Sequence, residues 1–226
     1  MDRKEQIRNA YRMTGKNADF YDGMMTCSTL SGKAICRMVW NMDQEKTLSS
    51  FEAALSGIPE DFSGRLLEVP VGTGVLTMPV YQSIPKAEIT CLDSSERMMD
   101  SACQKARAAG ITNIRFVKGD AGALTFADES FDLVLSLNGF HAFADKEAAW
   151  RETFRVLKKD GIFCGCFYIQ GGCTRTDFMV RTFYEPAGYF TPPYETEISL
   201  KRRLSRMYRE VRVTRTEGIA SFVCRK

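Results

Sequence analysis

The chain has a single histidine, His141, among its 226 residues, and its eight cysteines include no Cys-x-x-Cys pair. Structural zinc sites draw their ligands from closely spaced cysteines and histidines, so we expect no metal. Four of the cysteines lie in apolar, strand-like runs, where thiols behave as small hydrophobic side chains: Cys91, Cys164, Cys166 and Cys224. This usage is typical of a reducing compartment, and it predicts a cytoplasmic location.

The sequence also has no apolar segment long enough to cross a bilayer. The longest apolar stretch without a charge, Gly161–Cys173, is short and rich in glycine, whereas a membrane-spanning helix needs about 20 apolar residues. Residues Met1–Gln6 show no apolar core of a signal peptide. We therefore expect a protein with neither a transmembrane segment nor a leader.

Neither sign of charge is in large excess, since the formal net charge is only +3. This value is too small to demand a nucleic-acid partner, and we expect none. Positive residues gather in the segment Leu200–Lys226, which has nine Lys and Arg residues against two Glu. We interpret residues 197–209 as an amphipathic surface helix with a solvated basic face. The alternative is a surface for an anionic substrate, RNA or a membrane.

From residue 65 onward, apolar runs alternate with amphipathic stretches of helical length. This alternation predicts βαβ units and a parallel sheet with helices on both faces, which is an α/β fold of the Rossmann-like, doubly wound kind. Five runs read as strands: Leu66–Val69, Glu88–Leu92, Ile114–Val117, Phe131–Leu135 and Ile162–Phe167.

Two segments lie outside this alternation. Residues 1–62 precede the first strand and read as a helical cap, so we divide the chain into this cap and a domain over residues 63–226. The segment 171–197 is an insertion after the fifth strand, rich in aromatic residues and proline. An insertion at that position can fold over the crevice at the carboxyl ends of the strands.

A glycine turn follows the first strand and carries Gly72 and Gly74. Glycines at such a turn let a ligand approach the backbone closely. A dinucleotide-binding turn would read G-x-G-x-x-G, but the register that starts at Gly72 ends on Thr77, and the one that starts at Pro70 ends on Val75. The glycine pair alone therefore does not identify the ligand.

Two acidic residues follow the next strands, at the edge where a doubly wound sheet contacts its ligands. Asp93 ends the second strand, and Asp120 follows the third. A carboxylate at Asp93 can accept hydrogen bonds from both hydroxyls of a ribose, and Asp120 suits an adenine amino group.

These residues together resemble the class I methyltransferase family, particularly its small-molecule branch with the ubiquinone and menaquinone methyltransferases. The resemblance covers roughly residues 20 to 170. It is carried by Glu68-x-Pro70-x-Gly72-x-Gly74, Asp93, Gly119-Asp120-Ala121, the segment Phe131–His141 and the segment Arg155–Gly161, and less distinctly by Tyr21-Asp22 with Trp40. Pro70 departs from the family pattern, which usually has glycine there, and its ring removes an amide N–H from the turn.

The resemblance implies S-adenosylmethionine as methyl donor, S-adenosylhomocysteine as product and a small-molecule acceptor. It also implies two antiparallel strands, about Glu210–Arg215 and Ile219–Arg225, that complete a seven-stranded, mostly parallel sheet. Glu68 would orient the cofactor's ammonium or the glycine turn. The full set of expected cofactor-binding residues is Tyr21, Glu68, Gly72, Thr73, Gly74, Asp93, Ser94, Asp120, Ala121 and Asn138.

Acceptor chemistry is less defined by the sequence. His141 is the candidate general base, because its ordinary pKa of about 6.5 suits proton abstraction, although a packing role is the alternative. We predict that acceptor choice resides in the cap, including Tyr11, Tyr21 and Trp40, and in the insertion 171–197. Two other functions stay open: a nicotinamide-dependent oxidoreductase, and a protein that binds S-adenosylmethionine without catalysis.

Overall fold

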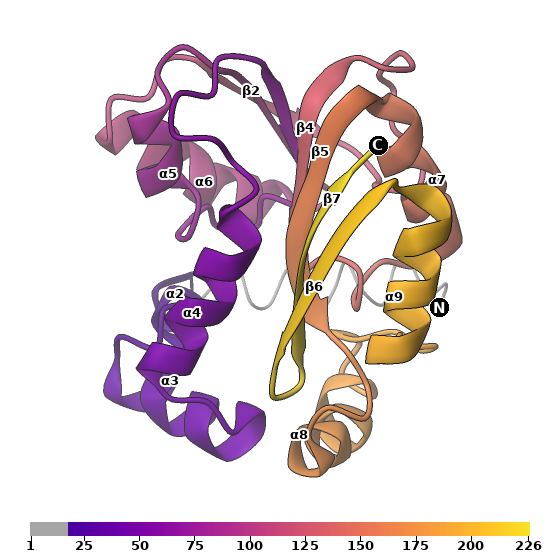
Figure 1. Ribbon diagram of the computed structural model, residues 1–226. Coiled ribbons are helices and arrows are strands. Elements are labelled where there is room, and N and C mark those ends of the chain that lie inside the picture. The colour runs from indigo at the N-terminus through magenta and orange to yellow at the C-terminus, as the bar shows by residue number, and fades with distance from the viewer. Residues whose placement is uncertain (1–17) are drawn as a thin grey trace.

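The computed structural model describes residues 18–226, which fold around one seven-stranded sheet (Figure 1). The strand order is β3-β2-β1-β4-β5-β7-β6. The strands are β1 (Arg65–Glu68), β2 (Glu88–Asp93), β3 (Ile114–Lys118), β4 (Phe131–Leu137), β5 (Leu157–Tyr168), β6 (Glu210–Thr216) and β7 (Ile219–Arg225). Strands β1 to β5 are parallel, and β7 runs antiparallel to both β5 and β6. The predicted fold and its C-terminal hairpin are confirmed.

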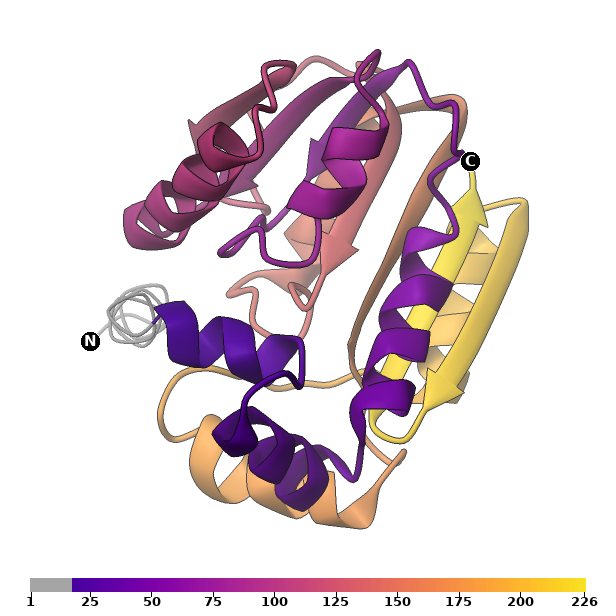
Figure 2. The ribbon, with the colours of Figure 1, turned by 90° about the vertical axis from the view of Figure 1, so that its left-hand side faces the viewer.

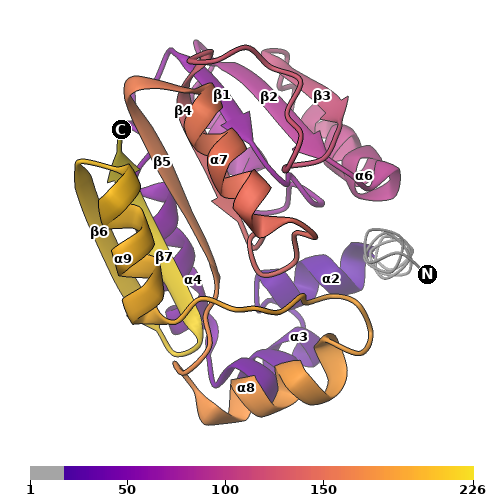
Figure 3. The same cartoon turned by 90° about the vertical axis from the view of Figure 1, so that its right-hand side faces the viewer.

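Helices cover both faces of the sheet. They are α2 (Ala18–Met25), α3 (Leu30–Ile35), α4 (Gln44–Leu55), α5 (Met78–Ser83), α6 (Glu96–Ala108), α7 (Lys146–Val156), α8 (Thr174–Met179) and α9 (Glu197–Met207), with π-helical turns η2 (Cys36–Trp40) and η3 (Val180–Tyr184). Helices α4, α5 and α6 lie on one face, and α7 and α9 on the other (Figures 1 and 3). Helices α2, α3 and α8 gather beyond the carboxyl ends of β1 to β5 (Figure 2).

The strand alternation explains the two hydrophobic cores, one on each face. Along β5, Cys164 and Cys166 belong to the core under α4 and α5, while Phe163 and Phe167 belong to the core under α7 and α9. Trp150 of α7 is buried in the second core. All eight cysteines are free thiols.

The helix after β2 shows how local sequence sets an element's limits. The Ser95 hydroxyl accepts a hydrogen bond from the amide of Met98 and caps the start of α6. Gly110 follows the last turn with φ = 69°, a left-handed conformation that favours glycine. Both limits depend on local residues, and they place the start of α6 at the carboxyl end of β2.

Strand β5 starts earlier than the sequence predicted. The polar run Lys158–Gly161 reads as a turn, yet the strand begins at Leu157, directly after α7. Phe131 pairs with Leu157, and Lys158 Nζ lies 2.8 Å from a carboxylate oxygen of Asp132. The next pair of β4 and β5 is Leu133 with Ile162, so the polar run lies in an irregularity between these two pairs.

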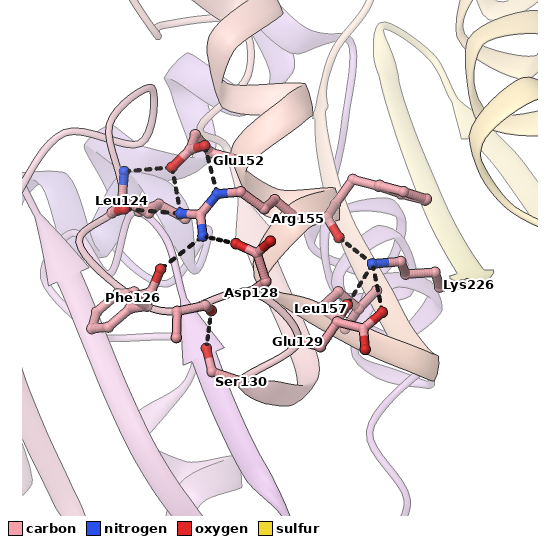
Figure 4. Close-up of polar contacts among 11 residues, drawn as sticks. Leu124, Phe126, Asp128, Glu129, Ser130, Glu152, Arg155, Leu157 and Lys226 are labelled. Carbon is pink, nitrogen blue, oxygen red and sulfur yellow. Dashed lines mark hydrogen bonds and ion pairs between the residues drawn. The ribbon is translucent and has the colours of Figure 1, made fainter.

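Figure 4 shows the polar network that anchors the amino ends of β4 and β5. Arg155 of α7 contacts carboxylate oxygens of Asp128 at 2.7 Å and Glu152 at 2.8 Å, and donates to two backbone carbonyls of the loop before β4. Lys226 donates to the carbonyl of Leu157 at 2.7 Å. The network fixes the end of the sheet opposite the cap helices.

Helix α4 does not lie with the cap helices, although it belongs to the predicted cap segment 1–62. It packs on β5 and β7 (Figure 2), and the Ser221 hydroxyl of β7 donates to the carbonyl of Ser50 at 2.7 Å. The described part of the segment thus has two roles, because α2 and α3 lie beyond the strand ends while α4 covers the sheet. The division at residue 62 stays a prediction.

The basic C-terminal segment forms an amphipathic helix, as predicted. Leu200 and Leu204 of α9 are buried, and Arg203 contacts Glu147 at 2.6 Å and Glu195 at 2.7 Å. Its positive charge is thus partly neutralised by neighbouring carboxylates. No helix within residues 18–226 has the length and apolar character needed to cross a membrane.

Candidate active site

A cavity of about 300 Å³ lies at the carboxyl ends of β1, β2, β3 and β4. All ten residues expected to bind the cofactor line it: Tyr21, Glu68, Gly72, Thr73, Gly74, Asp93, Ser94, Asp120, Ala121 and Asn138. Residues up to 117 positions apart in the sequence thus meet at one edge of the sheet, where an open α/β fold binds its ligands.

The glycine turn forms one wall of this cavity. Gly72 and Gly74 have φ of 56° and 70°, and a Cβ added at Gly72 would meet no atom within 4 Å, so its backbone is open to a ligand. The amide of Val71 donates to the carbonyl of Leu92 at 2.9 Å. The turn is therefore anchored to β2 although Pro70 supplies no amide.

Asp93 is 6% exposed and joins the turn to helix α6. Its Oδ2 accepts from the amide of Gly72 and its Oδ1 from the amide of Ser95, both at 2.8 Å. Burial raises the pKa of the Asp93 carboxyl to about 6, against the lowering effect of these amides. Each carboxylate oxygen has a second lone pair, so these bonds leave capacity for a ligand.

Glu68 is 1% exposed at the end of β1. Its Oε2 accepts from the hydroxyl of Tyr81 at 2.8 Å, from that of Thr77 at 3.1 Å and from the Cys91 thiol at 3.5 Å. Burial raises the pKa of the Glu68 carboxyl to about 8, so it is mostly protonated at neutral pH. A cation bound beside it would favour the ionised form.

Asp120 and Ala121 lie on the opposite side of the cavity, in the turn after β3. Asp120 Oδ1 accepts from the amide of Gly122 at 2.9 Å, and Ala121 is buried. The pair therefore lies both in a backbone turn and at the cavity.

Sequence reasoning missed Asp22 of α2, although it noted the pair Tyr21-Asp22. The Asp22 carboxylate accepts a hydrogen bond from the hydroxyl of Thr73 in the glycine turn, and its Oδ2 lies 2.8 Å from Lys105 Nζ of α6. Tyr21 beside it lines the cavity, and burial near Asp93 raises the pKa of its hydroxyl. Two polar contacts of Asp22 therefore hold α2 beside the cavity.

A second cavity of about 560 Å³ adjoins the first and shares Tyr21, Met25 and Asn138 with it. Its walls come from α2, α3, η2, α4, the loop after β4 and the insertion. Its described lining residues include no Asp, Glu, Lys or Arg: Phe20, Tyr21, Met24, Met25, Ile35, Cys36, Val39, Trp40, Met42, Thr47, Ser50, Phe51, Asn138, His141, Met179, Phe183, Tyr184, Tyr189, Phe190 and Ile219. An uncharged cavity of this size suits a neutral, largely apolar ligand.

The insertion supplies part of this second cavity. Phe183, Tyr184, Tyr189 and Phe190 line it, whereas Phe178 is 62% exposed at the surface. Tyr194 packs beside Tyr168, with ring centroids 5.3 Å apart, and does not line either cavity. The predicted cap residue Trp40 lies 6.0 Å from both Tyr184 and Phe190 between ring centroids. Tyr11 lies outside the described residues.

His141 lines the second cavity and not the first. Its Nδ1 accepts from the amide of Tyr168 at 3.2 Å, so the neutral ring carries its hydrogen on Nε2. Burial, with a smaller effect of the Lys146 charge, lowers the pKa of His141 to about 3. This geometry argues against the expected role as a general base, because the basic lone pair is already engaged.

Comparison with known proteins identifies the central part of the chain. Residues 66–161 match a family described as a methyltransferase domain. The chain is 40% identical to the demethylmenaquinone methyltransferase of Thermus thermophilus over 97 residues. This aligned region covers 43% of this chain and 44% of that protein. Residues 66–161 are therefore similar to a methyltransferase domain. The chain spans less than half the length of these curated relatives.

Solved structures extend the likeness of fold to nearly the whole chain. A methyltransferase of Thermotoga maritima, titled an S-adenosylmethionine-dependent enzyme and possible histamine N-methyltransferase, is similar with a TM-score of 0.68 and 19% identity over 96% of this chain and 99% of that one. The cyclase SpnF is similar with a TM-score of 0.69 and 18% identity over 97% and 96%. Since proteins named for different reactions share this fold, the function must be argued from the site.

Proposed function

We propose that this protein transfers the methyl group of S-adenosylmethionine to a neutral small molecule and releases S-adenosylhomocysteine. The observation that carries the proposal is the pair of adjoining cavities. One contains the glycine turn and the acids Glu68 and Asp93, and the other has no charged side chain among its described lining residues. They meet at Tyr21, Met25 and Asn138, so a donor in the first would face an acceptor in the second.

The residues of the first cavity fit the parts of the cofactor. Asp93 would accept from the ribose hydroxyls, Glu68 would hold the ammonium, and Asp120 with Ala121 would bind the adenine. The cofactor supplies a methyl group already activated by its sulfonium. The chain's contribution is then to hold the acceptor in line with that methyl group and to exclude water, which can supply most of the rate.

The acceptor class follows from the second cavity. A charged group moved there from water would lose its hydration and meet no opposite charge among the described lining residues, which is costly. We therefore propose a neutral acceptor, bound mainly by aromatic surface. The nicotinamide-dependent alternative is not favoured, because the turn lacks its third glycine and residues 66–161 match a methyltransferase domain. The free thiols support the proposed cytoplasmic location.

Ligand-dependent thermal unfolding of the full chain tests the cofactor. S-adenosylhomocysteine at about 100 times its Kd should stabilise the protein by about 2.7 kcal/mol, while NADH at the same concentration should leave the unfolding temperature unchanged. Stabilisation by NADH alone would refute the proposal.

The acceptor class is tested by incubating the protein with S-adenosylmethionine and measuring S-adenosylhomocysteine formation. Neutral phenols and neutral aromatic amines form one arm, and histamine, which is cationic at neutral pH, forms the other. Transfer should occur only in the neutral arm. Methylation of histamine without any neutral acceptor would contradict the assignment of the second cavity.

A further inference from the structure

The second cavity is lined by a histidine whose two ring nitrogens differ in their surroundings. His141 is 6% exposed, and its Nδ1 is occupied by the amide of Tyr168. Among residues 18–226 no group hydrogen-bonds to Nε2, which carries the ring hydrogen, and the residue lines the cavity. An N–H that faces a cavity without a protein acceptor is available to hydrogen-bond a ligand there.

The direction of this N–H is held by the surrounding structure. The ring of His141 stacks on Phe190 of the insertion, with centroids 4.0 Å apart and planes 15° apart. The carbonyl of His141 accepts from the amide of Thr191 at 2.9 Å, and the Tyr168 amide fixes the other edge of the ring. A donor restrained on three sides loses little freedom when it binds an acceptor atom.

Three other polar groups on the cavity wall have partners within the protein. The hydroxyls of Thr47 and Ser50 donate to carbonyls of their own helix at 2.7 and 2.8 Å, and the Cys36 thiol donates to the carbonyl of Met24 at 3.2 Å. The hydroxyl of Tyr184 also lines the cavity and can donate or accept. His141 is therefore a fixed, obligate donor in a predominantly aromatic cavity.

We propose that the Nε2–H of His141 recognises a neutral oxygen, a carbonyl or phenol oxygen, on a ring-shaped acceptor and so fixes the orientation of that ring in the second cavity. His141 is then a positioning residue that selects the acceptor, and no proton leaves or joins its ring. That the bound ring is a methyl acceptor rests on the proposed methyl transfer, but the preference of the cavity for an oxygen-bearing ring can be measured by binding alone.

The test uses two probes of nearly the same shape, 1-tetralone with a ring carbonyl and tetralin without one. Their affinities for the full chain are measured by calorimetry in the presence of saturating S-adenosylhomocysteine. His141→Asn keeps an oxygen that can accept from the Tyr168 amide but withdraws the donor from the cavity. His141→Gln places an N–H near the position of Nε2 and serves as the matched control.

His141→Asn should weaken tetralone binding about three- to tenfold, as expected for one hydrogen bond, and change tetralin binding less than twofold. His141→Gln should restore most of the tetralone affinity. In the wild-type protein the single histidine gives one imidazole spectrum by NMR, and its Nε2 signal should shift with tetralone but not with tetralin. This last measurement needs no variant.

An equal loss for both probes in His141→Asn, or an Nε2 signal unaffected by bound tetralone, would overturn the inference. So would a wild-type protein that binds S-adenosylhomocysteine but neither probe, and in that case the proposed methyl transfer would still stand. Tetralone binding without any cofactor binding would instead refute the proposed function and leave the donor role intact.

Discussion

Glu68 is the group whose charge state cofactor binding should change most. Burial raises its pKa to about 8, so at pH 7 the carboxyl is about 90% protonated in the free protein. An ammonium bound beside it would lower that pKa below 7, and about 0.9 proton would leave. The ligand's amino group is that of a free amino acid and is already protonated at pH 7, so it takes up almost no proton on binding. Binding should therefore release most of one proton at pH 7.

Calorimetric titration of S-adenosylhomocysteine in phosphate and in Tris measures this number, because the two buffers have different ionisation enthalpies. Glu68→Gln keeps a carbonyl oxygen that can accept from Tyr81 and Thr77 but cannot ionise, so its net proton release should fall near zero. An equal proton release in the two proteins would refute the assignment of Glu68 to the ammonium, whatever the effect on affinity.

The same pKa predicts an effect on the stability of the free protein. Because the pKa of Glu68 is raised in the folded state, its carboxyl contributes stability that is fully present below the unfolded-state pKa of about 4.5 and is lost as the pH rises toward about 8. Urea unfolding of the wild type should therefore show a loss of stability between about pH 5 and pH 8 that is absent from Glu68→Gln. A parallel pH dependence in both proteins would show that Glu68 is ionised when buried.

Two further predictions concern the walls of the first cavity. Asp22→Ala removes the contacts to Thr73 and Lys105 and should speed S-adenosylhomocysteine dissociation about three- to tenfold in stopped-flow measurements, whereas Asp43→Ala, which loses only the N-cap of α4, should leave that rate unchanged. Asp93→Ala should weaken binding of the same ligand by about 1–3 kcal/mol in calorimetry and also lower the unfolding temperature, because buried amides lose their acceptor. An unchanged affinity in folded Asp93→Ala would leave only the structural role.

The parts of the fold that the sequence predicted are those with local signals. The glycine turn at Gly72 and Gly74, the acid at the end of β2 and the cap at Ser95 each depend on a few consecutive residues. The predicted start of β5 was too late because Lys158–Gly161 reads as a polar turn, whereas the strand begins at Leu157 and contains this run as an irregularity. Leu157 pairs with Phe131, which lies 26 residues earlier in the sequence, and a local pattern gives no sign of this pairing.

The second cavity could not be predicted in the same way. Its walls join residues 20–51, 138–141 and 179–190, and its uncharged character is a property of the assembled surface rather than of any one segment. The sequence identified the aromatic content of the insertion but not which rings face inward. The role of His141 changed most, because its position after β4 was predictable whereas the amide of Tyr168 and the ring of Phe190 were not.

The two cavities differ in charge, and this difference restricts the chemistry of the transfer. Glu68 and Asp93 line the first cavity, where charge-assisted hydrogen bonds from the ammonium and the hydroxyls of the donor can offset the free-energy cost of burying the two carboxyl groups. The second cavity has no charged group among its described lining residues, so a neutral acceptor enters it with little loss of hydration. With no carboxylate or basic imidazole there to remove a proton, the acceptor atom must be nucleophilic by its own chemistry. Selection then rests on shape and on the fixed donor at His141, and rate rests on alignment across Tyr21, Met25 and Asn138, where the two cavities meet.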